Sequence, residues 1–163
     1  MKKIRFYGKR GIGKVFTIDP EDEKMVSKHR WYYQIANKKS GSYPYVYTMV
    51  GKHHLRLHRY LMDCPDGMVV DHINHDTLDN RRSNLRVCTP TQNKQNMKPQ
   101  KSIQSKYKGV SIKQNGKWQA AIMADTKFHY IGTFDTERDA AVAYNFASKM
   151  LHKEYGILND IDY

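Results

Sequence analysis

The segment from Met97 to Lys106 divides the chain into two parts. It is polar and basic and lacks the apolar periodicity of a helix or strand, which is typical of a linker. A chain of 163 residues is long enough for one domain or for two small ones. The segment favours two domains, residues 1–97 and 107–159, joined by a basic linker at residues 98–106.

Positive charge is concentrated in one stretch of the sequence. The formal net charge is +12, and the 45 residues from Asn80 to Ala124 contain 10 Lys or Arg and no Asp or Glu. Solvated surfaces usually mix the two signs, so this acid-free stretch predicts a surface that faces phosphates. Contact with a membrane surface is the weaker interpretation, because the stretch contains no long basic amphipathic helix.

Several protein classes are excluded by what the sequence lacks. No apolar run approaches the roughly 18 residues of a membrane span. The basic start lacks the apolar stretch of a secretory signal, so we expect a cytoplasmic protein. The two cysteines, Cys64 and Cys88, form no Cys-x-x-Cys pair, which favours buried free thiols over a disulfide framework or a cysteine-based zinc finger.

The first part of the chain predicts short strands around one helix. Asp19-Pro20, followed by two acids, is typical of a helix start, with Asp19 as the N-cap and a helix to about Lys28. Residues 13–18 are strand-like, and runs of aromatic and β-branched residues predict strands at 30–36 and 43–50, the last two separated by a polar loop.

Two further strands and a short helix are predicted between Met68 and Met97. The strands cover residues 69–72 and 84–88. Thr89 and Gln92 have the spacing of a capping box, and Pro90 lies where the first turn of a helix tolerates proline. Asn93 is therefore expected in the first or second turn of that helix.

Four residues of this segment have the chemistry needed to hydrolyse a phosphodiester. Asp71, His72, Asn84 and Asn93 together supply a pair of hard oxygen ligands for a divalent ion, Mg²⁺ or Mn²⁺, and one imidazole. Imidazole suits a general base, because its reference pKa of about 6.5 lies near neutral pH. Each of these residues alone would be weak evidence of a site.

Their arrangement resembles the HNH homing endonucleases of bacteriophages and mobile elements. The resemblance is carried by residues 70–74, 78–86 and 89–93, and upstream by Leu57-His58-Arg59 and residues 18–22. It implies a ββα-metal core at about residues 68–97, in which His72 is the general base. By the same resemblance Asp71 and Asn93 would hold the metal, and Asn84 would brace the loop that positions His72. The family pattern often has glycine where this chain has His75, and the last motif position is asparagine rather than histidine.

A zinc site built from Cys64, His72, His75 and Cys88 is the competing interpretation, but the spacing of these residues matches no zinc pattern. His58 is more typical of a structural residue, and the predicted site omits it. The positive residues near the site that are expected to contact double-stranded DNA are Arg81, Arg82 and Lys94.

The last third of the chain predicts a three-stranded antiparallel sheet packed on one helix. Strands are expected at residues 109–114, 117–124 and 128–134, with Asn115-Gly116 as a hairpin turn. Thr136 and Asp139 have the spacing of a helix start. The apolar stripe expected to pack on the sheet is Ala140, Ala143, Tyr144, Ala147 and Leu151. With the first part, the predicted fold class is α+β.

This region, from about Lys106 to Asn159, resembles the Apetala-type DNA-binding domain of plant ethylene-response factors. The runs 105–112, 116–122 and 130–144 carry the resemblance. In that family the sheet enters the major groove and the helix packs behind it. Strand alternation turns Val110, Ile112, Trp118, Ala120 and Ile122 towards the helix. The residues expected to face DNA are Lys108, Ser111, Lys113, Lys117, Gln119 and Tyr130.

The chain departs from the plant pattern at several positions that carry arginine or tryptophan there. They are Ser111, Asn115, Ala121, Met123 and Phe128 in this sequence. Because arginine makes the commonest bidentate contact to a base, we expect a different or looser base readout than that of the plant factors.

These observations predict a metal-dependent DNA endonuclease that nicks or cuts duplex DNA and is targeted by its C-terminal module. We expect a monomer or dimer with no obligatory protein partner, in the host cytoplasm if a phage encodes it. Two other functions stay open: a non-catalytic DNA-binding regulator, which would not need all four site residues, and an RNA-binding or ribosome-associated protein, which the composition permits.

Overall fold

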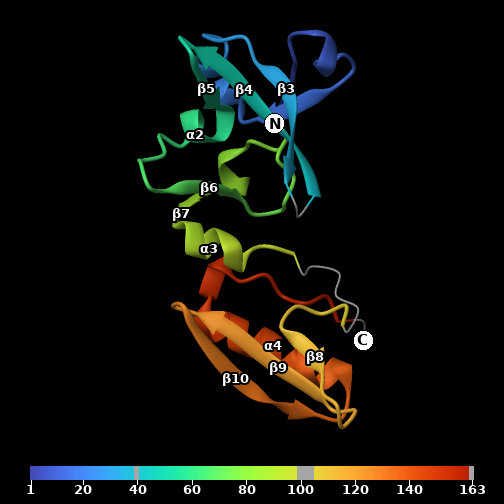
Figure 1. Ribbon diagram of the computed structural model, residues 1–163. Helices are drawn as coiled ribbons and strands as arrows, with labels where there is room; N and C mark the ends of the chain where they lie inside the picture. Colours follow the sequence, from blue (N-terminus) through green and yellow to red (C-terminus); the bar gives the residue numbers. More distant parts are fainter. Residues whose placement is uncertain (39–40, 99–104, 162–163) are drawn as a thin grey trace. The chain divides into compact units, whose positions relative to one another are not determined.

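The computed structural model describes residues 1–38, 41–98 and 105–161, which form two compact units, Met1–Pro90 and Thr91–Tyr163 (Figure 1). Small antiparallel sheets and helices make up both units, which confirms the α+β class. Most of the expected linker, residues 98–106, lies outside the described residues. No helix in the described part of the chain is both long and apolar enough to cross a bilayer.

The core of the first unit lies between two small sheets and short helices. β1 (Lys2–Arg5) pairs with β2 (Val15–Ile18), while β3 (Tyr32–Lys38), β4 (Gly41–Val50) and β5 (His53–Arg56) form an antiparallel meander. The connecting helices are η1 (Lys9–Gly11), η2 (Pro20–Asp22), α1 (Glu23–Val26) and α2 (Leu57–Leu61). Large apolar side chains of the unit, Phe16, Ile18, Trp31, Val46 and Leu57 among them, are fully buried together.

A third, two-stranded sheet carries the predicted site. β6 (Val69–His72) runs antiparallel to β7 (Leu85–Cys88), with Asp71 opposite Arg86 and His72 opposite Leu85. The short helix η3 (Arg82–Asn84) precedes β7, and α3 (Pro90–Gln95) follows it and begins at the predicted proline. The order strand, strand, helix agrees with the expected core. The division into units falls at Pro90, earlier than the expected domain end at residue 97.

The connection between β6 and β7 is held against the rest of the first unit. The Thr17 N–H donates to the carbonyl of Leu78 at 2.8 Å, and the Asn80 N–H donates to the carbonyl of Thr17 at 2.8 Å. The Thr77 hydroxyl donates to the carbonyl of Pro44 in β4. This polar loop is therefore fixed by hydrogen bonds at both β2 and β4.

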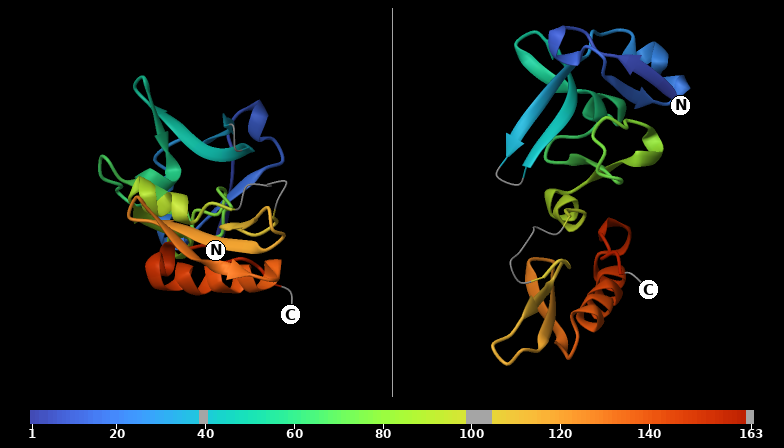
Figure 2. Two further views of the ribbon diagram at one scale, coloured as in Figure 1. Left: turned by 60° about the horizontal axis from the view of Figure 1, so that its bottom comes forward. Right: turned by 90° about the vertical axis from the view of Figure 1, so that its right-hand side faces the viewer.

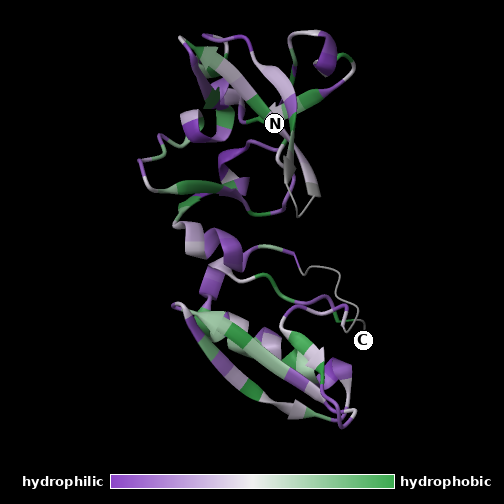
Figure 3. Cartoon of the chain, in the orientation of Figure 1, coloured by the Kyte–Doolittle hydropathy of each residue, from purple (hydrophilic) through white to green (hydrophobic). Residues whose placement is uncertain are grey.

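In the second unit, three antiparallel strands pack on one long helix (Figure 2). The strand order is β10 (Lys127–Phe134), β9 (Trp118–Ala124), β8 (Val110–Ile112), and the helix is α4 (Glu137–Leu151), with η4 (Lys153–Tyr155) after it. Figure 3 shows apolar residues along β9, whose alternate members Ala120 and Ile122 are buried. Trp118 packs against this core, as expected.

The close approach of sheet and helix in the second unit depends on Gly109. Its φ of +72° lies in the left-handed region that favours glycine. A Cβ at this position would lie within 3.0 Å of both the Tyr144 ring and the Ala121 carbonyl oxygen. The Gly109 carbonyl accepts a hydrogen bond from the Ala121 N–H at 2.9 Å, so any side chain here would push apart elements that are bonded to each other.

Several local expectations are wrong. Asp19 makes no side-chain cap at the helix start, because its carboxylate accepts a hydrogen bond from the Arg82 N–H at 2.8 Å. Ile112 is paired opposite Trp118 and so lies on the same sheet face, as expected, although it is 43% exposed. The buried stripe of α4 consists of Ala140, Ala141, Tyr144 and Ser148, whereas Leu151 is 44% exposed. The cap of α4 is confirmed, since Thr136 accepts a hydrogen bond from the Asp139 N–H at 3.0 Å.

Candidate active site

His72 ends β6 as a buried side chain, 7% exposed. Its Nε2 lies 3.4 Å from Oδ1 of Asn80, a fully buried residue of the loop after β6. The Asn80 amide is oriented by its Nδ2, which donates to the carbonyl of Thr77 at 3.3 Å. Since an amide oxygen only accepts, this contact requires the proton on Nε2 of His72 and leaves the lone pair of the neutral ring on Nδ1.

Burial lowers the pKa of His72 below its ordinary value, although Asn80 and the Asp71 carboxylate oppose the shift. The imidazole is therefore neutral at neutral pH. A neutral imidazole is the form that accepts a proton from water, so the environment suits a general base.

His58, which was not predicted as a site residue, lies against His72. The two rings are perpendicular, at 84°, with centroids 5.1 Å apart. Burial, followed by the neighbouring His72 and Arg56, lowers the pKa of His58 to about 3, so this ring stays neutral as well. His58 and Asn80 are both contacts of His72 that we did not predict. Both occur in the runs that carry the family resemblance, and the sequence offers no other signal for them.

Asp71 is buried beside His72 and bound to an arginine. Its Oδ2 accepts hydrogen bonds from Nε and Nη2 of Arg86 at 2.9 and 2.7 Å. The two side chains are 7% and 14% exposed, and they face each other across β6 and β7. Buried carboxylates need such a partner. A metal ion at Asp71 would have to share the carboxylate with this guanidinium.

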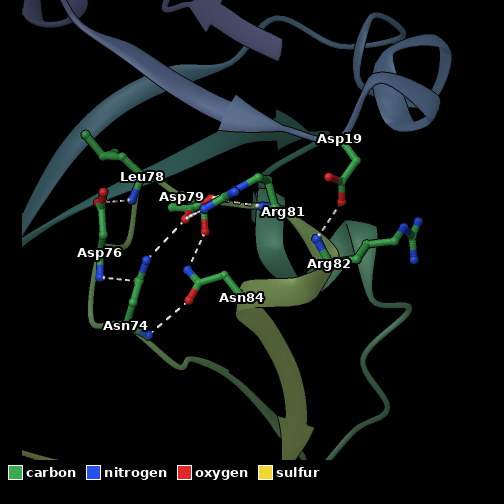
Figure 4. A network of polar contacts seen from close by, with 8 residues as sticks. All are labelled: Asp19, Asn74, Asp76, Leu78, Asp79, Arg81, Arg82 and Asn84. Carbon is green, nitrogen blue, oxygen red and sulfur yellow. Dashed lines mark hydrogen bonds and ion pairs between the residues drawn. The ribbon is translucent and has the colours of Figure 1, made fainter. Parts of the chain in front are cut away.

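Asn84 braces the loop that follows His72 (Figure 4). Its Oδ1 accepts from the Asn74 N–H at 2.9 Å, and its Nδ2 donates to the carbonyl of Asp79 at 2.8 Å. The side chain is buried, so one amide connects the two ends of the loop. That Asn84 thereby positions His72 for catalysis stays a prediction.

The two arginines after the loop are bound to carboxylates. Arg81 donates from Nε and Nη2 to the two Asp79 oxygens at 2.7 and 2.6 Å, and its guanidinium lowers the pKa of Asp79 (Figure 4). Arg82 donates from Nε and Nη2 to the buried Asp22 at 3.0 and 2.7 Å. Both were expected to contact DNA. The structure gives each a role within the protein, and DNA contact by their exposed parts stays a prediction.

The alternative of a zinc site is not supported. Among the described residues, no group of three or more His, Cys, Asp or Glu side chains is arranged to hold a metal ion. Cys88 is buried, and burial raises the pKa of its thiol, which disfavours the thiolate that zinc requires. A site of one carboxylate and one amide, as expected from Asp71 and Asn93, has a different donor set from the zinc site.

Asn93 is half-buried on α3 and belongs to the second unit, so its metal-binding role stays a prediction.

Most of the residues expected to face DNA in the second unit lie on or beside the sheet face turned away from α4. Ser111 pairs with Gln119, and both lie on the opposite side of the sheet from the buried Ala120. Tyr130 is 54% exposed, with the Lys113 ammonium 5.4 Å from the centre of its ring. Lys117 is exposed and pairs with Asp135, and Lys94 is exposed on α3. Their contact with DNA stays a prediction.

Lys108 has a different role from the one expected. Its ammonium donates to the carbonyls of Gln95 and Met97 at 2.6 and 2.8 Å, at the end of α3. Burial lowers its pKa to about 8. A half-buried lysine that satisfies the last carbonyls of a helix stabilises that helix end. The expectation that Lys108 faces DNA is therefore wrong for its ammonium group.

Comparisons with known proteins agree with the chemistry of the first unit. Residues 50–95 match the HNH endonuclease family. Protein 3.8 of Escherichia phage T7 is 33% identical over 92 residues, which cover 56% of this chain and 75% of that protein. An AP2/ERF and B3 domain-containing transcription factor of Arabidopsis thaliana is 44% identical over 59 residues, 36% of this chain but only 17% of that factor. No solved structure shows a significant match.

One match extends over almost the whole chain. An uncharacterized HNH endonuclease of Acanthamoeba polyphaga mimivirus is 35% identical over 160 residues, which cover 94% of this chain and 79% of the viral protein. The family match also includes Asp71, His72, Asn84 and Asn93. The chain therefore belongs to the HNH endonucleases.

Proposed function

We propose that this endonuclease hydrolyses phosphodiester bonds of double-stranded DNA with His72 as its general base. The observation that carries the proposal is the environment of His72. The ring is buried and neutral, and Asn80 orients it. His72 is the last residue of β6, and the carboxylate residue Asp71 comes directly before it in the same strand. A fixed neutral imidazole accepts the proton of an attacking water, and the braced loop at Asn84 keeps the ring in position.

Asp71 and Asn93 are the proposed ligands of Mg²⁺ or Mn²⁺. A carboxylate and an amide oxygen are hard ligands of the kind these ions take, with water and phosphate oxygens completing the shell. A bound ion would supply charge neutralisation at the phosphate and at the leaving oxygen. Arg86 would hold the Asp71 carboxylate in its orientation, because it binds Oδ2 through two nitrogens.

The second unit is the proposed targeting module. The support is its outer sheet face, where Gln119 and Tyr130 lie with Lys113 beside them, within or next to the acid-free stretch of the sequence. The partial matches to plant factors support the same assignment weakly. The domain limits of residues 1–97 and 107–159 stay a prediction from the sequence, since the compact units divide after Pro90.

The test is cleavage of a duplex DNA library by the full chain with Mg²⁺, followed by sequencing of the ends. His72→Ala should lower the cleavage rate by on the order of 10²–10⁴-fold, the usual cost of losing a general base. Duplex affinity in EDTA should stay unchanged, and so should the cleavage rate of the control His53→Ala, which alters an exposed histidine on β5.

Asp71→Ala and Asn93→Ala should each raise the Mg²⁺ concentration needed for half-maximal cleavage. A wild-type rate in His72→Ala would remove His72 from the role of base. An unchanged Mg²⁺ dependence in either ligand variant would remove that residue from the metal site.

A further inference from the structure

The outer face of the three-stranded sheet in the first unit joins aromatic and cationic side chains. Residues paired across antiparallel strands point to the same side of a sheet. Tyr47 in β4 lies opposite Tyr32 in β3 and opposite Arg56 in β5. The neighbours of Tyr47 along β4, Val46 and Thr48, are buried in the unit, so this row points outward.

A pocket of about 400 Å³ lies at this row. Its lining includes Lys28, His29, Arg30, Tyr32, Tyr47 and Met49. The volume falls within the roughly 300–1,000 Å³ of small-ligand sites. Two tyrosines and two cations line it, and none of its lining residues is acidic.

The charge around the pocket has one sign over a long stretch of chain. The 39 residues from Lys24 to Met62 contain no Asp or Glu, eight Lys or Arg, and six of the twelve tyrosines. Within the described part of the chain, Lys28 and Arg30 form no ion pair with a carboxylate. Their charge therefore attracts an anionic ligand, and a phosphate fits that requirement.

The aromatic side chains provide flat surfaces beside these cations. His54 stacks on Tyr47, with ring centroids 4.7 Å apart and planes 12° apart. Tyr32 is tilted by 42° to Tyr47 at 5.8 Å, so these two rings do not stack on each other although both line the pocket. Planar rings next to a cationic rim are the surfaces that bind single nucleic-acid strands, because bases stack on the rings while phosphates meet the cations.

We propose that this pocket binds an unpaired nucleotide of a DNA strand, with its base against Tyr32 and Tyr47 and its phosphates at Lys28 and Arg30. Bases within a duplex keep both faces stacked on their neighbours, so the rings can receive only a base that has left the stack. Only one part of the inference, the choice of DNA as the ligand, rests on the proposed function. It adds unpaired DNA to the substrate and concerns a surface apart from His72.

Photocrosslinking locates the bound base. The full chain in EDTA is mixed with an oligothymidine carrying one 5-iododeoxyuridine, irradiated and digested, and the linked peptide is identified by mass spectrometry. The expected crosslink is to Tyr32 or Tyr47, suppressed by unlabelled oligothymidine better than by a duplex of equal length. Crosslinks confined to residues 105–161, or equal suppression by the duplex, would overturn the proposal. Cleavage plays no part in this measurement, so an inactive nuclease would still give the expected crosslink.

Affinity for fluorescent oligothymidine separates stacking from charge. Tyr47→Leu should weaken binding by about 5- to 150-fold, the loss of one base–aromatic stack, while Tyr47→Phe keeps the ring and should bind like the wild type. Lys28→Ala with Arg30→Ala should flatten the dependence of log K on log salt by about 0.7 for each phosphate that these side chains neutralise. The control Lys3→Ala with Arg5→Ala removes the same charge from β1 and should change neither quantity.

Circular dichroism shows whether each variant folds. If Tyr47→Leu does not, the double variant of Lys28 and Arg30 decides the question. Wild-type affinity and salt slope in the folded pocket variants would overturn the site. Tighter binding of oligouridine RNA than of oligothymidine would overturn the choice of DNA.

Discussion

Arginines in the first unit and lysines in the second use their positive charge differently. Arg81, Arg82 and Arg86 each bind a carboxylate of their own unit with two nitrogens, and the carboxylates of Asp22 and Asp71 are buried. These arginines stabilise the loop and the strands around the candidate active site.

In the second unit two lysines, Lys113 and Lys117, lie exposed beside the outer sheet face. Lys113 is exposed next to the ring of Tyr130, and Lys117 makes an ion pair with Asp135 in which both side chains are more than half exposed. Such a pair contributes little to stability. Lys108 differs from both, since its ammonium is bound to backbone carbonyls. The acid-free stretch of the sequence thus combines structural arginines with lysines accessible to a ligand, and a count of charges does not distinguish them.

If the arginines of the first unit are structural, Arg86→Ala should be strongly destabilising. It leaves the buried Asp71 carboxylate without its guanidinium, a change that typically costs about 3–5 kcal/mol. Urea unfolding would measure this, with Lys113→Ala as a control of equal charge change. Equal midpoints for the two variants would contradict the structural role. A larger stabilisation by Mg²⁺ in Arg86→Ala than in the wild type would support Asp71 as a metal ligand.

The stability of the second unit should depend on close packing more than on ion pairs. Gly109→Ala places a Cβ against Tyr144 in a left-handed backbone, so we expect a loss of about 2–4 kcal/mol. Gly116→Ala is the matched control, since its φ is also positive, at 78°, but nothing lies within 4 Å of the added Cβ. That variant should lose only about 1 kcal/mol. Similar losses in thermal unfolding would show that backbone strain alone, without packing, explains the requirement for Gly109.

Two lysines of the second unit should respond in opposite ways. Lys113→Met should flatten the salt dependence of duplex affinity by about 0.9 and leave the melting temperature unchanged. Lys108→Met should lower the melting temperature, because the carbonyls of Gln95 and Met97 lose their donor, and should leave the salt slope unchanged. A flattened salt slope in Lys108→Met would show that the Lys108 ammonium contacts DNA.

The smallest effect is a pH dependence from Lys108. Burial lowers its pKa from 10.5 to about 8, so folding favours the neutral amine. The cost of the buried charge is fully present below pH 8 and disappears as the pH rises to about 10.5. As the pH rises through this window, the melting temperature of the wild type should therefore increase relative to that of Lys108→Met. Parallel curves for the two proteins would show that the ammonium is not desolvated.

Elements with a local chemical signal were predictable from the sequence. The Thr136 cap depends on residues three positions apart, and the start of α3 on a single proline, so neither needs the rest of the fold. β5 and α2 are four and five residues long and had no such signal. Asp19 carried a strong capping signal, yet a backbone N–H 63 positions further along the chain binds its carboxylate instead.

The candidate site was predictable in its residue types and not in its contacts. His72 and Asp71 follow from a pattern along the chain, but the contacts of His72 with His58 and Asn80, and the burial that keeps its ring neutral, arise only through the fold. The acid-free stretch at residues 24–62 was not recognised from the sequence. Asp and Glu residues on both sides of it make the first half of the chain, taken as a whole, appear mixed in charge.

The bond from Lys108 to the end of α3 has a consequence for protein engineering. A chimaera joined within residues 98–106 would separate α3 from the lysine that holds the carbonyls of Gln95 and Met97. A joint just before Pro90 keeps α3 together with Lys108 and lies next to the division between the compact units, which falls after Pro90. A donor module exchanged there brings its own version of α3 and must supply the asparagine of position 93. If the proposed function holds, target preference and one metal ligand would then be transferred together with α3.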